Sequence, residues 1–161
     1  MIRLLFVCMG NICRSPLAQG VFEDHVARAG LVDHIEADSA GTHAYHIGEP
    51  PDPRSQAIAR QHGLDLSHQR ARRIAVADLQ GFDLVLAMDA DNLSQITRLA
   101  QRAGGSTVAS VHRLLDFAPE AGTEDIPDPY YGGDDGFARV YHLVDLGSAG
   151  LLEHLKRRGR H

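Results

Sequence analysis

An apolar segment near the start of the chain, followed directly by a short loop and a helix start, most constrains the fold. Residues 2–7 are apolar apart from Arg3, which is typical of a buried central parallel strand. The loop that follows has the sequence Cys8-Met9-Gly10-Asn11-Ile12-Cys13-Arg14-Ser15-Pro16. Ser15 can cap a helix and Pro16 suits its first position, so this stretch predicts a strand, a tight loop and a helix in succession.

The rest of the chain alternates predicted strands and helices. Strands are expected at 2–8, 35–39, 82–87 and 107–111. Helices are expected at 15–29, 52–62, 73–79, 90–103 and from Phe137 to Leu155. Residues 116–133 are expected to form a long acidic loop. This alternation predicts an α/β fold with a parallel sheet, helices on both faces and a single domain over residues 1–161. In such sheets ligands bind at the carboxyl ends of the strands, where the loop after Ile2–Val7 lies.

Composition excludes several classes of protein. The formal net charge is −5, which argues against a general nucleic-acid partner. No apolar stretch reaches the roughly 18 residues of a membrane span, and no signal-peptide pattern is present, so no membrane partner is expected. The 2 cysteines do not form a disulfide framework. We therefore expect a cytoplasmic protein whose thiols stay reduced.

The residue types in the Cys8 loop suit the capture of an oxyanion. Backbone N–H groups at a helix start, with the helix dipole, favour an anion. Gly10 gives backbone freedom, Asn11 tolerates a left-handed conformation, and Arg14 can bind two oxygens. The same field stabilises a thiolate at Cys8, which predicts nucleophilic catalysis. Ser15 either hydrogen-bonds that thiolate or serves as a helix cap, and both roles are compatible.

The loop from Cys8 to Pro16 resembles the signature of the low-molecular-weight protein tyrosine phosphatases. Other blocks resemble the same family over nearly the whole chain, namely 38–42, 48–54, 88–89 and 128–131. The resemblance implies a three-layer sandwich with a four-stranded parallel sheet in the order 2-1-3-4. It also implies that no metal or other cofactor is required, because the loop and Arg14 supply the electrostatic stabilisation.

The resemblance further implies catalytic roles. Cys8 is the nucleophile that becomes a phosphocysteine, Arg14 binds the phosphate and the transition state, and Asp128 protonates the leaving phenolate and then activates water. The phosphate-binding residues are Met9, Gly10, Asn11, Ile12, Cys13, Arg14 and Ser15. A second Asp-Pro pair, Asp52-Pro53, has the arrangement of a helix start, so Asp128 is favoured as the acid over Asp52. The alternative for Asp128 is a simple turn residue.

Supporting roles follow from the same resemblance. Asn11, Ser39 and His68 match positions that hold the loop in shape by hydrogen bonds, although each alone could be a satisfied polar residue. Cys13 could form a reversible disulfide with Cys8 that protects against overoxidation. The alternative for Cys13 is a small buried packing residue.

The wall of the pocket is expected to consist of Ile12, Tyr45, Tyr130 and Tyr131. Aromatic walls suit a phenyl ring and set the depth that a phosphate monoester must reach. Many relatives carry Trp where Tyr45 stands. Relatives that prefer phosphoarginine tend to carry Thr where Ile12 stands, so Ile12 favours phosphotyrosine.

The resemblance therefore implies hydrolysis of phosphotyrosine in a protein substrate, with a bacterial tyrosine kinase as one candidate partner and a monomer or weak dimer as the assembly. Two alternatives use the same fold. An arsenate reductase needs further redox cysteines, and none follows Cys13. A phosphocysteine carrier or phosphate-binding module needs no water-activating acid, which Asp128 would supply.

Overall fold

Parallel strands form a central sheet in the order β2-β1-β3-β4, which confirms the predicted α/β fold and strand order. The computed structural model describes residues 1–104, 107–130 and 134–158. The strands in these residues are β1 (Ile2–Cys8), β2 (Ile35–Gly41), β3 (Leu84–Ala87) and β4 (Ser110–Arg113). Because all pairings are parallel, the carboxyl ends of the strands lie at one edge of the sheet.

Strand β1 is buried on both faces, as its apolar run predicts. Leu4 and Phe6 belong to one hydrophobic core, and Leu5 and Val7 belong to the core on the opposite face. All four side chains are fully buried. The alternation of side chains along a strand therefore gives the sheet two cores, one beneath each helical layer.

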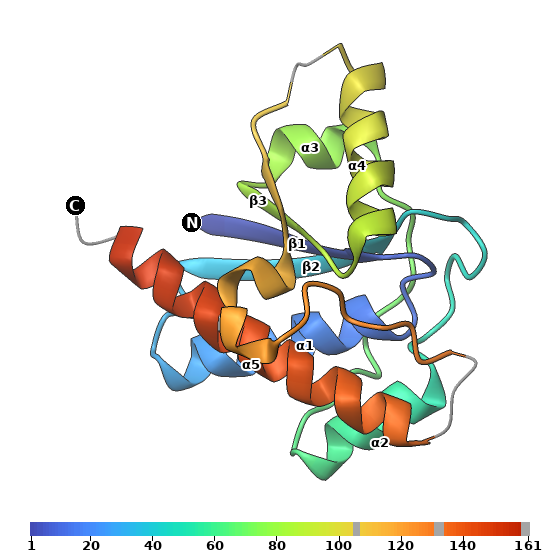
Figure 1. Ribbon diagram of the computed structural model, residues 1–161, viewed down its shortest axis with the longest axis vertical. Helices are drawn as coiled ribbons and strands as arrows, with labels where there is room; N and C mark the ends of the chain where they lie inside the picture. Colours follow the sequence, from blue (N-terminus) through green and yellow to red (C-terminus); the bar gives the residue numbers. More distant parts are fainter. Residues whose placement is uncertain (105–106, 131–133, 159–161) are drawn as a thin grey trace.

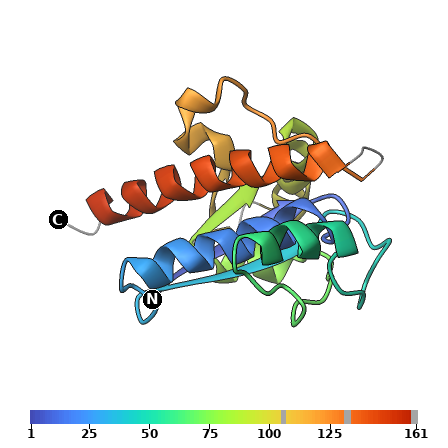
Figure 2. The same ribbon diagram turned by 90° about the horizontal axis from the view of Figure 1, so that it is seen from below.

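Helices cover both faces of the sheet and make three layers (Figure 1). One layer holds α1 (Arg14–Arg28), α2 (Pro53–Gln61) and α5 (Asp134–Arg158), and the other holds α3 (Val76–Gly81) and α4 (Ala90–Arg102). Helix α1 packs against both α2 and α5, and the view from below shows these helices together (Figure 2). In the part of the chain that the structure describes, no helix is long and apolar enough to cross a membrane.

The first helix begins two residues before Pro16, its predicted first position, and its cap is different. Helix α1 begins at Arg14 with Cys13 at the N-cap, where no side chain makes a capping hydrogen bond. The prediction of Ser15 as the cap is wrong because Ser15 already lies inside the first turn. Its hydroxyl lies 2.9 Å from the sulfur of Cys8 instead.

Several other boundaries differ from the prediction, among them the start of the third strand, which is Leu84 rather than residue 82. The segment 73–79 is helical only from Val76, because Arg73 forms a parallel bridge with Gly41 and extends the sheet edge. The fourth strand begins at Ser110, where pairing with β3 starts, rather than at residue 107. The expected loop at 116–133 includes part of one 3₁₀ helix, Leu114–Phe117, and all of a second, Pro119–Ala121.

Candidate active site

The loop between β1 and α1 is held in a left-handed turn at Asn11. Its φ of 59° lies in the left-handed region, which asparagine tolerates. The amide nitrogen of Asn11 donates to Ser15 Oγ at 2.8 Å and to Ser39 Oγ at 2.9 Å. Its amide oxygen accepts from the backbone N–H of Arg72 at 3.0 Å. One buried side chain thus joins the loop to α1, to β2 and to the segment before α3.

The glycines around the loop are explained by neighbouring atoms that leave no room for a Cβ, rather than by a positive φ. Gly10 has no positive φ, but a Cβ there would lie 3.0 Å from Cδ2 of His46. A Cβ on Gly41 would lie 2.7 Å from the carbonyl oxygen of Met9. Glycine at both positions therefore lets neighbouring segments pack tightly on the loop.

Cys8 lies at the floor of the loop, where Ser15 can stabilise its thiolate. The residue is 2% exposed, and its sulfur lies 2.9 Å from Ser15 Oγ. Because Asn11 donates to the same hydroxyl, the Ser15 proton can point toward the sulfur, and the competing acceptor, the Ala40 carbonyl, is 3.5 Å away. This arrangement provides a donor for a charged sulfur.

Cys13, in contrast, is held as a thiol. Burial, followed by the charges of Asp52 and Cys8, raises the pKa of Cys13 to about 12. Both cysteines are free and buried. Cys13 therefore remains protonated at neutral pH.

Arg14 reaches across the loop as a fixed cation. Its Nη1 donates to Asp89 Oδ2 at 2.6 Å and to the carbonyl oxygen of Ile126 at 2.9 Å. Burial alone lowers the pKa of Arg14, but Cys8 and Asp89 outweigh it and raise the pKa overall. The guanidinium is thus charged and oriented before any ligand binds.

Asp128 shares a cavity with Cys8 and Arg14. The cavity has a volume of about 280 Å³, and its lining includes all three side chains. Asp128 Oδ2 lies 3.7 Å from Arg14 Nη2, and Asp128 Oδ1 accepts from the backbone N–H of Tyr130 at 3.0 Å. Asp52 instead caps α2 by accepting from the backbone N–H of Arg54 at 2.8 Å. Asp128, and not Asp52, therefore lines the same cavity as Cys8.

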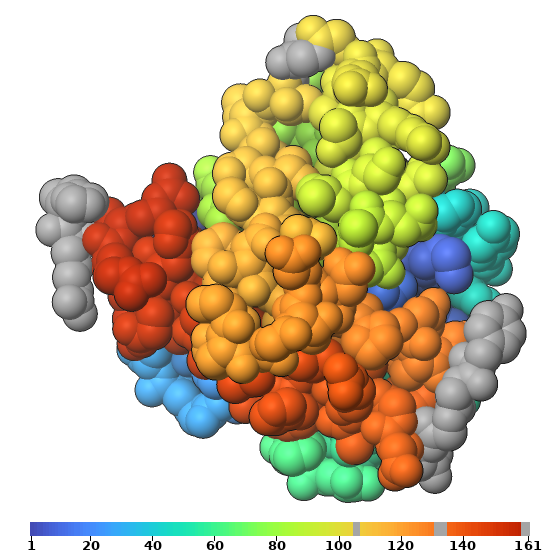
Figure 3. Space-filling view, viewed as in Figure 1, coloured from blue at the N-terminus to red at the C-terminus, as the bar shows by residue number. Residues whose placement is uncertain are grey.

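The rim of this cavity combines apolar and aromatic side chains. Ile12, Tyr45 and Tyr130 line it as expected, and Tyr131 lies outside the described residues. His46, which was not among the expected wall residues, also lines the cavity, and its ring centroid is 6.1 Å from that of Tyr130. His46 directly follows the expected wall residue Tyr45, and this adjacency is the sequence feature that could have indicated its place in the cavity. In the space-filling view, the N-terminal part of the chain (blue) is visible at the surface between α4, the residues numbered in the 120s (orange) and those in the 40s (cyan) (Figure 3).

Comparison with known sequences assigns the family. The sequence profile described as "Low molecular weight phosphotyrosine protein phosphatase" matches residues 3–161. The chain belongs to this family. A low molecular weight protein-tyrosine-phosphatase of Streptomyces coelicolor is 45% identical over 150 residues, covering 93% of this chain and 91% of the relative. The human low molecular weight phosphotyrosine protein phosphatase is 41% identical over 138 residues, covering 86% and 85%.

Solved structures agree with the family assignment. The crystal structure of YfkJ from Bacillus subtilis has a TM-score of 0.90 at 40% identity and covers 98% of this chain and 96% of that one. The Drosophila arginine phosphatase DARP has a TM-score of 0.91 at 31% identity and covers 96% and 98%. The fold is therefore shared with a protein tyrosine phosphatase of Entamoeba histolytica as well as with an arginine phosphatase.

One residue expected to support the phosphatase loop does not reach it. His68 is exposed, and no hydrogen bond joins it to the loop in the described residues. The buried neighbour Gln69 makes the contacts instead: its amide nitrogen donates to the Pro16 carbonyl at 3.1 Å, and its amide oxygen accepts from Ser39 Oγ at 3.5 Å. The expectation for His68 is wrong by one position along the chain, whereas Ser39 lies where it was expected.

Asp89 has a second role that its sequence position did not reveal. Its Oδ1 accepts from the backbone N–H of Asn92 at 2.8 Å and caps α4. Its other oxygen binds Arg14.

A metal would need a cluster of suitable ligands, and the described residues contain no group of three or more His, Cys, Asp or Glu side chains that could hold one.

Proposed function

We propose that this family member is a protein tyrosine phosphatase that hydrolyses phosphotyrosine monoesters through a phosphocysteine on Cys8. One observation carries the proposal: a single cavity is lined by the Cys8 sulfur, the buried Arg14 guanidinium and the Asp128 carboxylate. These groups are a nucleophile, an oxyanion ligand and a proton donor. They suit a phosphate monoester without a metal.

The first step forms the phosphoenzyme. The phosphate is bound by the N–H groups of loop residues 9–15 and by the Arg14 guanidinium. The Cys8 thiolate attacks phosphorus, so that an S–P bond forms as the P–O bond to the tyrosyl oxygen breaks. Asp128, as the carboxylic acid, gives its proton to that oxygen, and tyrosine leaves as the neutral phenol.

The second step hydrolyses the phosphoenzyme. The Asp128 carboxylate now takes a proton from water, and the water oxygen attacks phosphorus. The P–S bond breaks, and the electron pair returns to sulfur, where the Ser15 hydroxyl stabilises the thiolate by a hydrogen bond. The products are inorganic phosphate and the regenerated Cys8 thiolate, with Asp128 protonated for the next cycle.

The cavity rim favours a phenyl ring over a guanidinium. Tyr45 and Tyr130 offer aromatic surface, and Ile12 offers an apolar side chain without a hydrogen-bond partner for the nitrogens of phosphoarginine. The existence of an arginine phosphatase with the same fold makes phosphoarginine the second candidate. Ile12 is the residue that favours tyrosine.

Several finer features belong to the same proposal. The substrate is a phosphotyrosine-containing protein, for which a bacterial tyrosine kinase is a candidate, and neither nucleic acid nor membrane takes part. The chain acts in the cytoplasm of a bacterium as one domain, as a monomer or weak dimer. Cys13 forms a reversible disulfide with Cys8 when Cys8 is oxidised, which prevents irreversible oxidation of the nucleophile.

Phosphate release in the presence of a chelator tests the proposal. The wild type should release phosphate from a phosphotyrosine peptide faster than from a phosphoarginine peptide, and Cys8→Ser should abolish turnover on both. Cys13→Ser is the matched control, which should retain activity because Cys13 is not the nucleophile. Turnover by Cys8→Ser would refute the mechanism. Arsenate reduction by wild type, or an enzyme that stops at the phosphorylated state, would support the alternative functions.

A further inference from the structure

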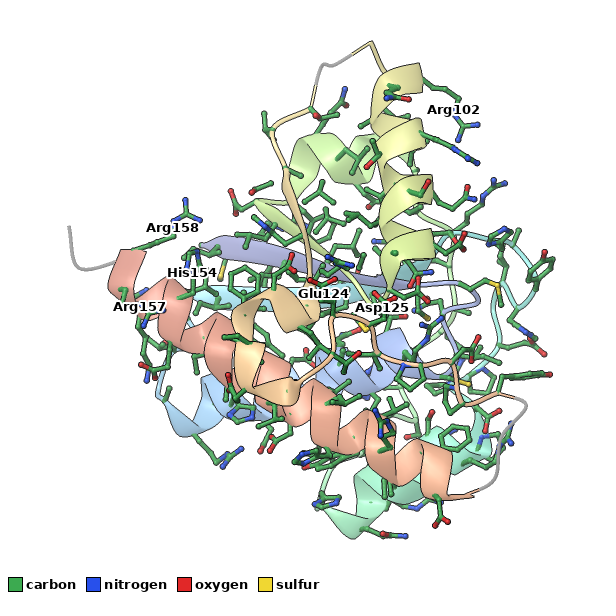
Figure 4. All side chains as sticks on the ribbon, in the orientation of Figure 1. Arg102, Glu124, Asp125, His154, Arg157 and Arg158 are labelled. Carbon is green, nitrogen blue, oxygen red and sulfur yellow. The ribbon has the colours of Figure 1, made fainter. Side chains whose placement is uncertain are left out.

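The mechanism above does not use an ion-pair cluster formed by Arg113, Glu124 and Asp125. Arg113 ends β4, and its side chain is 21% exposed. Its Nη1 lies 3.4 Å from Asp125 Oδ1, and its Nη2 lies 3.3 Å from a carboxylate oxygen of Glu124. Figure 4 shows Glu124 and Asp125 close to the end of α4 that faces the sheet edge.

The same acidic segment is joined to the element that carries Asp89. Asp125 Oδ1, which faces Arg113, also accepts from the backbone N–H of Ala90 in the first turn of α4 at 3.1 Å. The next residue, Ile126, donates its N–H to the Met88 carbonyl at 2.9 Å. Its own carbonyl accepts from Arg14. Residues 124–126 therefore connect β4, α4 and the phosphate-binding arginine.

The Asp128 side chain is held less firmly than the backbone that precedes it. Its hydrogen bond in the described residues is to the N–H of Tyr130 within its own turn, and its ion pair with Arg14 is long at 3.7 Å. The place of its carboxylate therefore depends on the path of residues 124–126. That path is held by the contacts of residues 124–126, and Arg113 takes part in them through Glu124 and Asp125.

We propose that Arg113 is a positioning residue for the general acid, because it fixes residues 124–126 and so holds Asp128 over Cys8. The inference rests on the proposed function and extends it to a residue outside the cavity. An arginine suits this role because its two terminal nitrogens reach Glu124 and Asp125 separately, whereas the single ammonium of lysine would serve one of them.

The size of the effect is limited by solvent. The Glu124 side chain is 78% exposed and that of Asp125 is 49% exposed, so their attraction to Arg113 is partly screened. Partly exposed ion pairs contribute little individually, and we expect a change of about fivefold in rate rather than the hundredfold or more of a lost general acid.

The test is the dependence of kcat/KM on the leaving group, measured with aryl phosphates from dinitrophenyl to phenyl phosphate. Arg113→Ala should lower kcat/KM about fivefold for phenyl phosphate and leave the dinitrophenyl value nearly unchanged, because a misplaced acid matters most for a poor leaving group. Arg113→Lys should lie between the wild type and Arg113→Ala. Asp128→Asn provides the reference slope for a lost acid.

Asp116→Asn is the matched control. Asp116 also faces Arg113, and its Oδ1 lies 3.8 Å from the Arg113 Nε. It belongs to the 3₁₀ helix Leu114–Phe117, and its side chain makes its hydrogen bond and ion pair with Arg113 rather than with residues 124–126. It should keep the wild-type dependence on leaving group. If Arg113→Ala does not fold, Asp125→Asn removes the ion pair between Arg113 and Asp125 from the other side, and its dependence on leaving group is measured instead.

Two results would overturn the inference: an equal loss on all leaving groups in Arg113→Ala, or wild-type values throughout. Both would leave the Cys8→Ser result untouched. Failure of this inference is therefore distinguishable from failure of the proposed function, which would appear as turnover without Cys8.

Discussion

At the scale of single residues, the two cysteines of the loop show how position decides chemistry. Cys8 is in contact with a hydroxyl that can donate to its sulfur, whereas Cys13 is buried near the Asp52 carboxylate. The surroundings of Cys13 favour the neutral thiol. In an oxidised enzyme, Cys13 would thus react as a thiol that must first lose its proton, which slows disulfide formation at neutral pH.

The raised pKa of Cys13 predicts how stability depends on pH. Burial raises the pKa of this thiol from 9.0 in the unfolded chain to about 12 in the folded protein. Above pH 9 the unfolded state therefore binds fewer protons, and the free energy of unfolding should fall by about 1.4 kcal/mol per pH unit through this residue. Urea unfolding of wild type and Cys13→Ala between pH 8 and 10.5 measures the difference. Parallel pH profiles for the two proteins would contradict the assignment.

Residue-level prediction from sequence succeeded where backbone chemistry restricts the choice of residue. The left-handed turn at Asn11 followed from the few residue types that tolerate a positive φ. The expectation for His68 failed because spacing along an irregular segment does not determine which of two adjacent side chains points inward. Gln69 is buried there, and His68 is exposed.

At the scale of elements, the first turn of α4 joins the helix cap to the phosphate site. Asp89 uses one oxygen for the backbone N–H of Asn92 and the other for Arg14. A cap signal is local and visible in a sequence, but the partner of the second oxygen lies 75 residues away along the chain. That second contact depends on the crossover from β1 to β3 and could be found only from the fold.

Substitutions at Asp89 should separate its two roles. Asp89→Asn retains an oxygen for the cap but loses the charge opposite Arg14, so kcat/KM should fall about tenfold with little change in stability. Asp89→Ala should show a similar loss of activity and, in addition, a free energy of unfolding lower by about 1 kcal/mol. Steady-state kinetics and urea unfolding measure the two quantities. Wild-type kcat/KM in Asp89→Asn would show that Arg14 needs no such partner.

Element boundaries were predicted best where the sequence pattern is regular. The buried run of β1 and the capped start of α2 are found at the expected residues. The start of β4 and the segment before α3 were displaced because pairing decides them: β4 begins where Ser110 meets Leu84, and Arg73 is drawn to the sheet edge by Gly41. Such long-range pairing is not encoded in local propensity.

At the scale of the whole molecule, α5 closes one face of the sheet and packs on α1 and on the 3₁₀ helix Leu114–Phe117. The approach is close at Gly150, where a Cβ would lie 1.9 Å from the carbonyl oxygen of Phe117. The chain between this 3₁₀ helix and α5 carries Asp128. Packing at α5 therefore supports the region that precedes the proposed acid.

Gly150→Ala should lower the free energy of unfolding by about 2–4 kcal/mol, because the backbone contact outweighs the gain in helix propensity. Gly136→Ala in the same helix is the control, since the nearest atom to its Cβ would be 3.6 Å away. That variant should be unchanged or stabilised by up to about 1 kcal/mol. Equal changes in the two variants, measured by urea unfolding, would contradict the packing argument.

The central claim is that phosphate passes through Cys8 and that Asp128 moves the protons. The most direct measurement is rapid mixing of Asp128→Ala with p-nitrophenyl phosphate, followed by acid quench and peptide mass spectrometry. The good leaving group needs little protonation, whereas hydrolysis of the intermediate lacks its base, so about one equivalent of nitrophenolate should appear in a burst and phosphate should be found on the peptide at Cys8. Phosphate on another residue, or slow turnover without a burst and without a phosphorylated peptide, would contradict the account.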